Sequence, residues 1–172
     1  MNVLELIKGL STGIAILIDP DKFKSESELL FYLEKVSYAN PNLVFIGGST
    51  VSKSDFQNCV KLAKTKISSP IVIFPGGSHQ LSEYADAILF LSLISGRNPD
   101  YLIGHHISSV TDLEQMNIEI IPTSYMLIDG GKKTSVEYIS NTNPIPKEAF
   151  SIARKTALAG KYLGHQLLYA DA

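Results

Sequence analysis

Short apolar runs that do not alternate with polar residues constrain the fold of this chain more than any other feature of its sequence. The runs are rich in Ile, Val, Leu and Phe, whereas a strand with one face in water would alternate apolar and polar residues. Unbroken runs are typical of strands covered on both faces, as in parallel sheets. We expect six such strands, at residues 13–18, 43–46, 71–74, 87–91, 118–121 and 166–169.

Stretches with helical periodicity separate these strands. The first has capping-box spacing at Ser25 and Glu28, followed by leucines on one face. We expect three more helices, from Phe56 to Ile67, from near Pro99, and from about Pro146 to Leu163 with Ala149, Phe150, Ala153, Ala157 and Leu158 turned inward. Residues 78–86 leave room only for a short helix.

Alternation of strand and helix predicts an α/β fold with right-handed crossovers and a parallel sheet. Glycines and polar residues follow each of the first four strands, as DPDK, GGST, PGGSH and the segment 92–98. In a closed barrel every carboxyl strand end faces one mouth, whereas an open sheet usually needs only the loops at its switch point. The pattern therefore favours a (β/α)8 TIM barrel.

The length of the chain sets a limit on that barrel. A closed eight-stranded barrel takes about 250 residues, whereas this chain has 172 and ends as its sixth predicted strand ends. We expect one domain over residues 1–172, a (β/α)8 barrel truncated at its C-terminus and present only through about the sixth strand. The alternative is an open, partly closed sheet with exposed edges.

Charge and composition exclude several classes of protein. The 15 basic and 17 acidic side chains form no long run of either sign, so we expect no nucleic-acid partner. The lone Cys59 lies at an inward helical position and is expected to be a buried structural residue. The N-terminus does not resemble a signal peptide and no run has membrane-spanning length, which predicts a cytoplasmic protein and still permits peripheral membrane contact.

Carboxylates and hydroxyls at the strand ends are the candidate ligands. Asp19 follows the first strand directly, and a carboxylate there suits Mg2+, which commonly bridges carboxylates to substrate phosphates. The alternative is an Asx-type turn in which Asp19 caps the next helix. Ser49, in Gly-Gly-Ser-Thr after the second strand, could join a Mg2+ shell or could belong to a plain turn. His79 after the third strand is either a base or a polar mouth residue.

Asp171 is the last acidic side chain and stands at the carboxyl end of the sixth strand. A carboxylate at this place could accept a proton from a substrate hydroxyl if the two come within about 3 Å. The alternative is an exposed residue of the tail.

The strand-end motifs, read together, resemble the geranylgeranylglyceryl phosphate synthase family in order and approximate spacing. They are LIDPDK, FIGGST, IFPGGSHQLS, SGRNPDYLIGHH, SYMLIDGGKKTSVEYISNTNPIP and the closing YADA, which together cover essentially the whole chain. The resemblance implies a TIM-barrel prenyltransferase that uses Mg2+ to join a prenyl diphosphate to the 3-hydroxyl of sn-glycerol 1-phosphate, making an ether lipid precursor.

The same resemblance implies roles for individual residues. Asp19 and Ser49 match metal ligands, and Tyr101 matches an aromatic that limits the prenyl groove. The substrate-binding element matches the last four residues, Tyr169, Ala170, Asp171 and Ala172, with Asp171 as the base where the family usually has Glu. A homo-oligomer is expected for the full-length protein.

The resemblance also shows what these residues lack. After Ala172 the family continues with glycine-rich loops that hold glycerol phosphate, so we expect residues 1–172 alone to be inactive and the intact protein to be active. Two alternatives stay open. One is another phosphate-binding barrel such as a sugar-phosphate isomerase or aldolase, and the other is a non-catalytic barrel fragment that acts as an assembly module.

Overall fold

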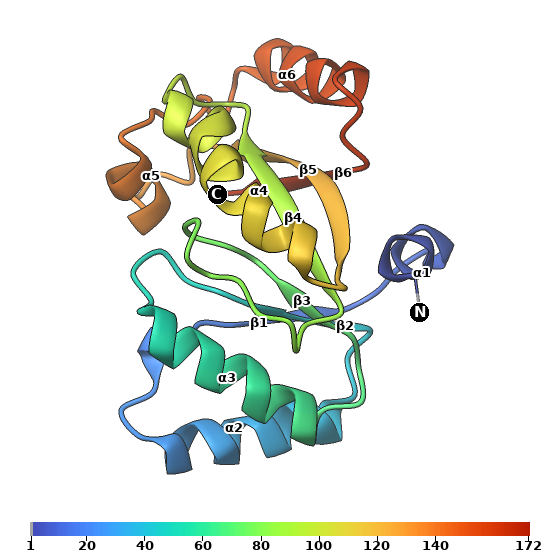
Figure 1. The fold of residues 1–172 in the computed structure, drawn as a ribbon. Helices are drawn as coiled ribbons and strands as arrows, with labels where there is room; N and C mark the ends of the chain where they lie inside the picture. Colours follow the sequence, from blue (N-terminus) through green and yellow to red (C-terminus); the bar gives the residue numbers. More distant parts are fainter. Residues whose placement is uncertain (1) are drawn as a thin grey trace. The chain divides into compact units, whose positions relative to one another are not determined.

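The computed structural model describes residues 2–172 and divides the chain into two compact units. The first unit runs to Leu89 and includes Ser109–Ile120; the second comprises Phe90–Ser108 and Ile121–Ala172. All described strands belong to one parallel sheet, in the order β1-β2-β3-β4-β5-β6 (Figure 1). The expected α/β class is therefore confirmed, as the first six strands of a (β/α)8 barrel.

Consecutive parallel strands build the first unit. Its elements are α1 (Val3–Gly9), β1 (Ala15–Ile18), a 3-10 turn (Pro20–Lys22), α2 (Glu26–Ala39), β2 (Leu43–Ile46), α3 (Lys53–Lys66), β3 (Ile71–Ile73) and the first half of β4 (Ala87–Leu93). β2 and β3 are almost wholly buried and α2 packs against α3, as expected for apolar runs covered on both faces (Figure 1).

The capping residue predicted for α2 is confirmed. Ser25 accepts a hydrogen bond from the Glu28 amide at 3.2 Å, which satisfies one of the free N–H groups at the start of the helix. The Glu28 carboxylate reaches one residue further back than in a standard capping box and accepts from the Lys24 amide at 2.9 Å. The helix ends at Asn40, which adopts the left-handed conformation with φ 44°.

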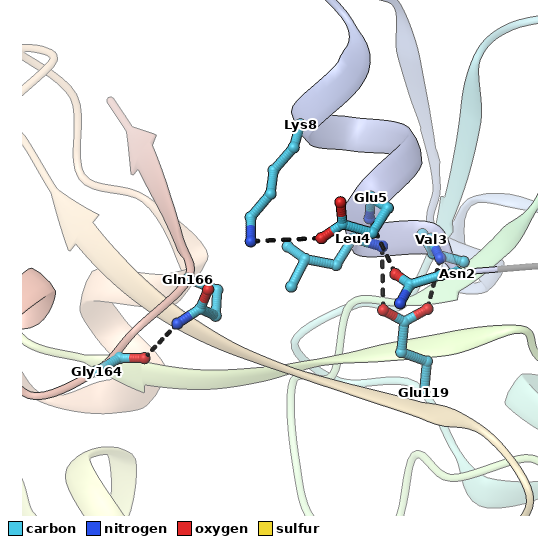
Figure 2. A network of polar contacts seen from close by, with 8 residues as sticks. All are labelled: Asn2, Val3, Leu4, Glu5, Lys8, Glu119, Gly164 and Gln166. Atoms are coloured by element: carbon cyan, nitrogen blue, oxygen red, sulfur yellow. Dashed lines mark hydrogen bonds and ion pairs between the residues drawn. The ribbon is translucent and has the colours of Figure 1, made fainter.

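The helix α1, which the sequence did not predict, is held by a carboxylate from the start of β5 (Glu119–Leu127). Glu119 accepts hydrogen bonds from the amides of Val3 at 2.5 Å and Leu4 at 3.1 Å, and Asn2 accepts one from Glu5 (Figure 2). The negative charge lies at the positive end of the helix dipole, where it is stabilising.

Replacing Glu119 should therefore loosen α1. We expect Glu119→Ala to lower the free energy of unfolding by about 1–2 kcal/mol, the usual cost of losing an N-terminal cap. Urea unfolding followed by circular dichroism measures the change. The matched control is Glu83→Gln, at an exposed site, which should stay within about 0.5 kcal/mol of the parent. Equal stability of Glu119→Ala and the control would contradict this role.

The second unit contains the last two strands and most of the C-terminal helices. After β4 come a π-helical turn (Asp100–Gly104), α4 (His105–Gln115), β5, α5 (Ser135–Ser140), α6 (Phe150–Tyr162) and β6 (Leu167–Asp171). α4 and β5 cross from one unit to the other. β5 pairs with β6 in parallel, from Thr123 opposite Leu167 to Leu127 opposite Asp171.

A small residue lets α6 approach β5. Gly160 lies so close to Ser124 that an added Cβ would overlap the Ser124 hydroxyl. That hydroxyl lies 2.6 Å from Nδ1 of His165, and the His165 amide donates to the Gly160 carbonyl. Burial lowers the pKa of His165. His165 therefore links Gly160, near the end of α6, to Ser124 of β5.

Several expectations about local structure were wrong. Residues 78–86 form turns without a helix, because Gln80 is fully buried and its side chain bonds Gly76 of its own loop and Gly48 of the loop after β2. Phe150, expected to face inward, is 73% exposed, because α6 begins only there rather than near Pro146. The fifth strand continues to Leu127, well beyond Ile121, because its second half pairs with β6. The short helix α5 was not foreseen.

Candidate functional site

Asp19 follows β1 directly and begins a tight turn. Its Oδ1 accepts a hydrogen bond from the Asp21 amide at 3.2 Å, and Pro20 starts the 3-10 turn. The Asx-type turn considered from the sequence is thus present. It uses only one carboxylate oxygen: among residues 2–172, no donor contacts Oδ2 of Asp19. The half-buried side chain can therefore cap the turn and still offer one oxygen to a ligand.

Glycines bring the loops after the first three strands into contact. A Cβ added to Gly48 would overlap Oδ1 of Asp19, and one added to Gly76 would overlap the carbonyl of Gly48. Added to Gly47, it would overlap the carbonyl of Phe74. Only glycine permits such close backbone approach. Asp19 consequently lies against the backbone of the segment that carries Ser49.

Ser49 is half-buried, and its hydroxyl makes no hydrogen bond within the described part of the chain. The neighbouring polar side chains already make hydrogen bonds within the protein. Thr50 donates to the carboxylate of Asp21 at 2.5 Å, and Ser52 caps α3 by accepting from the Asp55 amide. Of the hydroxyl groups of Ser49, Thr50 and Ser52, that of Ser49 is therefore the one without a hydrogen-bond partner in the described part of the chain.

The available donors fit Mg2+ as partial ligands. Mg2+ prefers oxygen, keeps several waters and usually takes only one or two carboxylates besides substrate phosphates. Asp19 and Ser49 offer a carboxylate oxygen and a hydroxyl oxygen of that kind. Residues 2–172 contain no group of three or more His, Cys, Asp or Glu side chains placed to hold a metal ion. The protein would therefore supply only part of the coordination.

His79 and Cys59 have structural roles in the first unit. Nε2 of His79 lies 2.9 Å from the carbonyl of Val51 and ties the loop after β3 to the loop after β2. Cys59 is fully buried, as expected, and burial together with the nearby charge of Asp19 raises the pKa of its thiol to about 12. A thiol that stays protonated is a poor nucleophile.

Substituting Gly48 tests this packing. Gly48→Ala should push the Asp19 carboxylate or the loop backbone aside, with a loss of about 1–3 kcal/mol of unfolding free energy, as for other overpacked sites. The matched control is Gly9→Ala, where an added Cβ meets no atom within 4 Å. Urea unfolding distinguishes the two variants. If Gly48→Ala is as stable as Gly9→Ala, the carboxylate does not lie against this backbone.

Asp171 in the second unit is held in place by several donors. The Tyr125 hydroxyl donates to Oδ2 at 2.6 Å, the Ala172 amide donates to Oδ1 at 3.0 Å, and the Ile128 amide donates to the backbone carbonyl at 2.8 Å. The side chain is half-buried. Asp171 is thus an ordered strand-end carboxylate, rather than the exposed tail residue that the sequence also allowed.

The residues around Asp171 differ in exposure. Tyr169 is half-buried, and its ring meets Tyr125 edge-on with centroids 5.5 Å apart. Ala170 and Ala172 are exposed, and their substrate contacts stay a prediction. Tyr125 is 6% exposed and was not singled out from the sequence. Its only signal was its place in the longest family-like segment, directly after the polar pair Thr123 and Ser124.

Tyr101 lies in the π-helical turn before α4, half-buried, with its ring edge-on to His105 at 4.8 Å between centroids. Burial and the nearby Asp100 carboxylate raise its pKa. A groove of about 540 Å³ opens beside it in the same unit. The groove is mainly apolar, with Arg97 and Lys155 among its lining residues. It includes Leu102 and not Tyr101, whose role in a prenyl groove stays a prediction.

Comparison with known proteins assigns the family. A profile described as the PcrB family matches residues 11–172. The chain belongs to the PcrB family. Three curated relatives of this PcrB chain are each named geranylgeranylglyceryl phosphate synthase. The one from Zunongwangia profunda is 46% identical over 92% of this chain and 67% of its own length. The one from Chitinophaga pinensis is 45% identical over 96% of this chain and 65% of its own length. The one from Flavobacterium johnsoniae is 43% identical over 99% of this chain and 70% of its own length. The resemblance seen in the motifs is thus confirmed.

Solved structures agree with this family. The PcrB chain matches (S)-3-O-geranylgeranylglyceryl phosphate synthase from Thermoplasma acidophilum, crystallised in complex with substrate sn-glycerol-1-phosphate, with a TM-score of 0.89 and 30% identity. Wild-type GGGPS from Thermoplasma volcanium matches with a TM-score of 0.89 and 28% identity. Each match covers 100% of this chain and 70% of the other. The chain therefore spans about two thirds of the length of its relatives.

Proposed function

We propose that the full-length protein is a Mg2+-dependent prenyltransferase that joins geranylgeranyl diphosphate to the 3-hydroxyl of sn-glycerol 1-phosphate. The observation that carries the proposal is the pair of ordered carboxylates that follow β1 and end β6, Asp19 and Asp171, in a chain of this family. The curated relatives named geranylgeranylglyceryl phosphate synthase support the same product.

The first unit is proposed to handle the diphosphate. Oδ2 of Asp19 and the hydroxyl of Ser49 would hold Mg2+, because both oxygens are without a partner in the described chain. When bound, Mg2+ neutralises charge on the diphosphate and makes it a better leaving group. The close glycine contacts keep the Asp19 carboxylate in one place, which limits the ordering needed on binding.

The second unit is proposed to supply the base. The 3-hydroxyl oxygen forms a bond to C1 of the prenyl chain while the bond between C1 and the diphosphate oxygen breaks, and the diphosphate leaves with the electron pair. Asp171 takes up the hydroxyl proton. Tyr169, Ala170 and Ala172 would contact glycerol phosphate beside it. This assignment rests on the resemblance of residues 169–172 to the substrate-binding element of the family.

Other parts of the prediction also remain proposals. Tyr101 would limit the length of the prenyl chain.

Ile103 and Ile107 lie one helical turn apart and are 54% and 67% exposed, which favours a homo-oligomer contact or a peripheral membrane contact at this surface. No helix within residues 2–172 is long and apolar enough to cross a membrane.

The proposal is tested with the full-length protein, labelled geranylgeranyl diphosphate and sn-glycerol 1-phosphate. We expect an ether product in Mg2+ and none in EDTA. Asp19→Asn and Asp171→Asn should each lower kcat/KM by at least about 100-fold, since each removes a group that acts at the reacting atoms. The control Asp112→Asn, at an exposed site on α4, should be as active as the parent.

One outcome would contradict this function, and a second would contradict the residue roles assigned within it. One is no prenyl transfer by the full-length parent in Mg2+. The other is wild-type turnover by Asp19→Asn or Asp171→Asn, which would remove the corresponding residue from the chemistry.

A further inference from the structure

We propose that Tyr125 is a positioning residue for Asp171: its hydroxyl holds Oδ2 of the carboxylate, and this leaves Oδ1 as the oxygen that accepts the substrate proton. The inference rests on the proposed function, in which Asp171 is the base. It adds a residue for which the motifs gave no role.

Strand register places both side chains on the same face of the sheet. In the β5–β6 pair, Tyr125 lies opposite Tyr169 and Leu127 lies opposite Asp171. Side chains alternate along a strand, and paired residues of parallel strands share a face. Ser124, which directly precedes Tyr125 and so points to the other face, lies against Gly160 of α6. Tyr125 and Asp171 therefore lie on the face of the sheet opposite α6.

The length of the tyrosine side chain matters at this position. Tyr125 pairs two residues before the partner of Asp171, an offset of about 6.6 Å at 3.3 Å per residue. A phenol is long enough to cover that offset, and its hydroxyl lies 2.6 Å from Oδ2. A serine or threonine at 125 would be too short to bridge it, and a phenylalanine would lack the donor.

The surroundings of Tyr125 keep its hydroxyl in one place. The side chain is 6% exposed, and the Tyr169 ring packs edge-on at 78° between ring planes. Burial and the hydrogen bond to Asp171 both raise its pKa, so the phenol remains protonated and donates across the working pH range. The bond to an ionised acceptor is of the stronger, charge-assisted kind.

The two carboxylate oxygens thus have different surroundings. Oδ2 accepts from the phenol, whereas the one donor to Oδ1 within residues 2–172 is the Ala172 amide at 3.0 Å, so that Oδ1 keeps lone-pair capacity for a further donor. The backbone of Asp171 is fixed as well, through the Ile128 amide. Rotation of the carboxylate would break the phenol contact. Fixing one oxygen therefore orients the other, and small errors in such placement are costly in rate.

The experiment compares Tyr125→Phe with Tyr162→Phe in the full-length protein. Tyr162 is 81% exposed and serves as the matched control. For Tyr125→Phe we expect kcat to fall about 10- to 100-fold while KM for the prenyl diphosphate stays unchanged, because the ring and its packing remain and only the orienting donor is lost. Tyr162→Phe should match the parent in both parameters.

A double-mutant cycle gives the readout that a packing role would not produce. In the Asp171→Asn background, Tyr125→Phe should lower residual turnover no further, because its effect acts through the carboxylate. If Tyr125→Phe does not fold, 3-fluorotyrosine at position 125 keeps the packing and makes the phenol a stronger donor. A stronger donor keeps the carboxylate oriented and makes it a weaker base, so this substitution should lower kcat a few-fold, and the same substitution at position 162 should not.

The outcomes separate the two proposals. When Asp171→Asn has strongly reduced but measurable turnover, two results overturn the positioning role alone: wild-type kcat in Tyr125→Phe, or an equal fold-loss from Tyr125→Phe in the parent and in the Asp171→Asn background. If Asp171→Asn keeps wild-type turnover, Asp171 is not the base, and the function proposed for it fails together with the role of Tyr125.

Discussion

Parallel pairing between consecutive strands is the constraint on which the candidate site depends. Ile18 of β1 pairs with Ile46 of β2, so that Asp19 and Gly47 leave the sheet together, and the Gly47 amide donates to the Ile18 carbonyl. The same rule acts in the second unit, where Asp171 pairs with Leu127. A register shift of one residue would turn every side chain of a strand to the other face. Strand register therefore fixes which polar groups meet at each strand end.

Much of this arrangement could be predicted from local sequence. The strand at residues 43–46 was placed correctly, and Ser25 was recognised as a cap, because apolar runs and capping residues act over a few positions. Asp19, Ser49 and Asp171 were selected as candidates because glycine and polar residues interrupt the apolar pattern at strand ends. The family-like order of the motifs then linked these residues to one chemistry.

Long-range contacts could not be predicted in that way. Glu119 caps a helix more than a hundred residues earlier, and Tyr125 reaches Asp171 across 46 positions, so neither has a local signature. Gln80 is fully buried, and where a short helix was expected its side chain bonds the Gly76 amide of its own loop and the Gly48 carbonyl of the loop after β2. The exposure of Phe150 depends on where α6 begins. In each case tertiary packing overrode the helical pattern or added a partner that local sequence does not encode.

The two units are proposed to carry different chemistry, which also distinguishes the proposed prenyltransferase from a sugar-phosphate isomerase or aldolase. Those enzymes would need a lysine or a Glu/His pair at the strand ends. Here Lys22 is exposed in a turn, and Nε2 of His79 lies within hydrogen-bond distance of the Val51 carbonyl. The carboxylate of Asp19 instead suits a metal ligand beside the prenyl diphosphate. The carboxylate of Asp171 suits a proton acceptor for the hydroxyl of sn-glycerol 1-phosphate.

The most direct test of this division is calorimetric titration of full-length Asp19→Asn and Asp171→Asn with each substrate separately. We expect Asp19→Asn to lose the Mg2+-dependent part of its affinity for a non-hydrolysable prenyl diphosphate analogue and to bind sn-glycerol 1-phosphate as the parent does. Asp171→Asn should show the reverse pattern, with weakened binding of sn-glycerol 1-phosphate alone. Equal weakening of both ligands in either variant would contradict the assignment of diphosphate to the first unit and glycerol phosphate to the second.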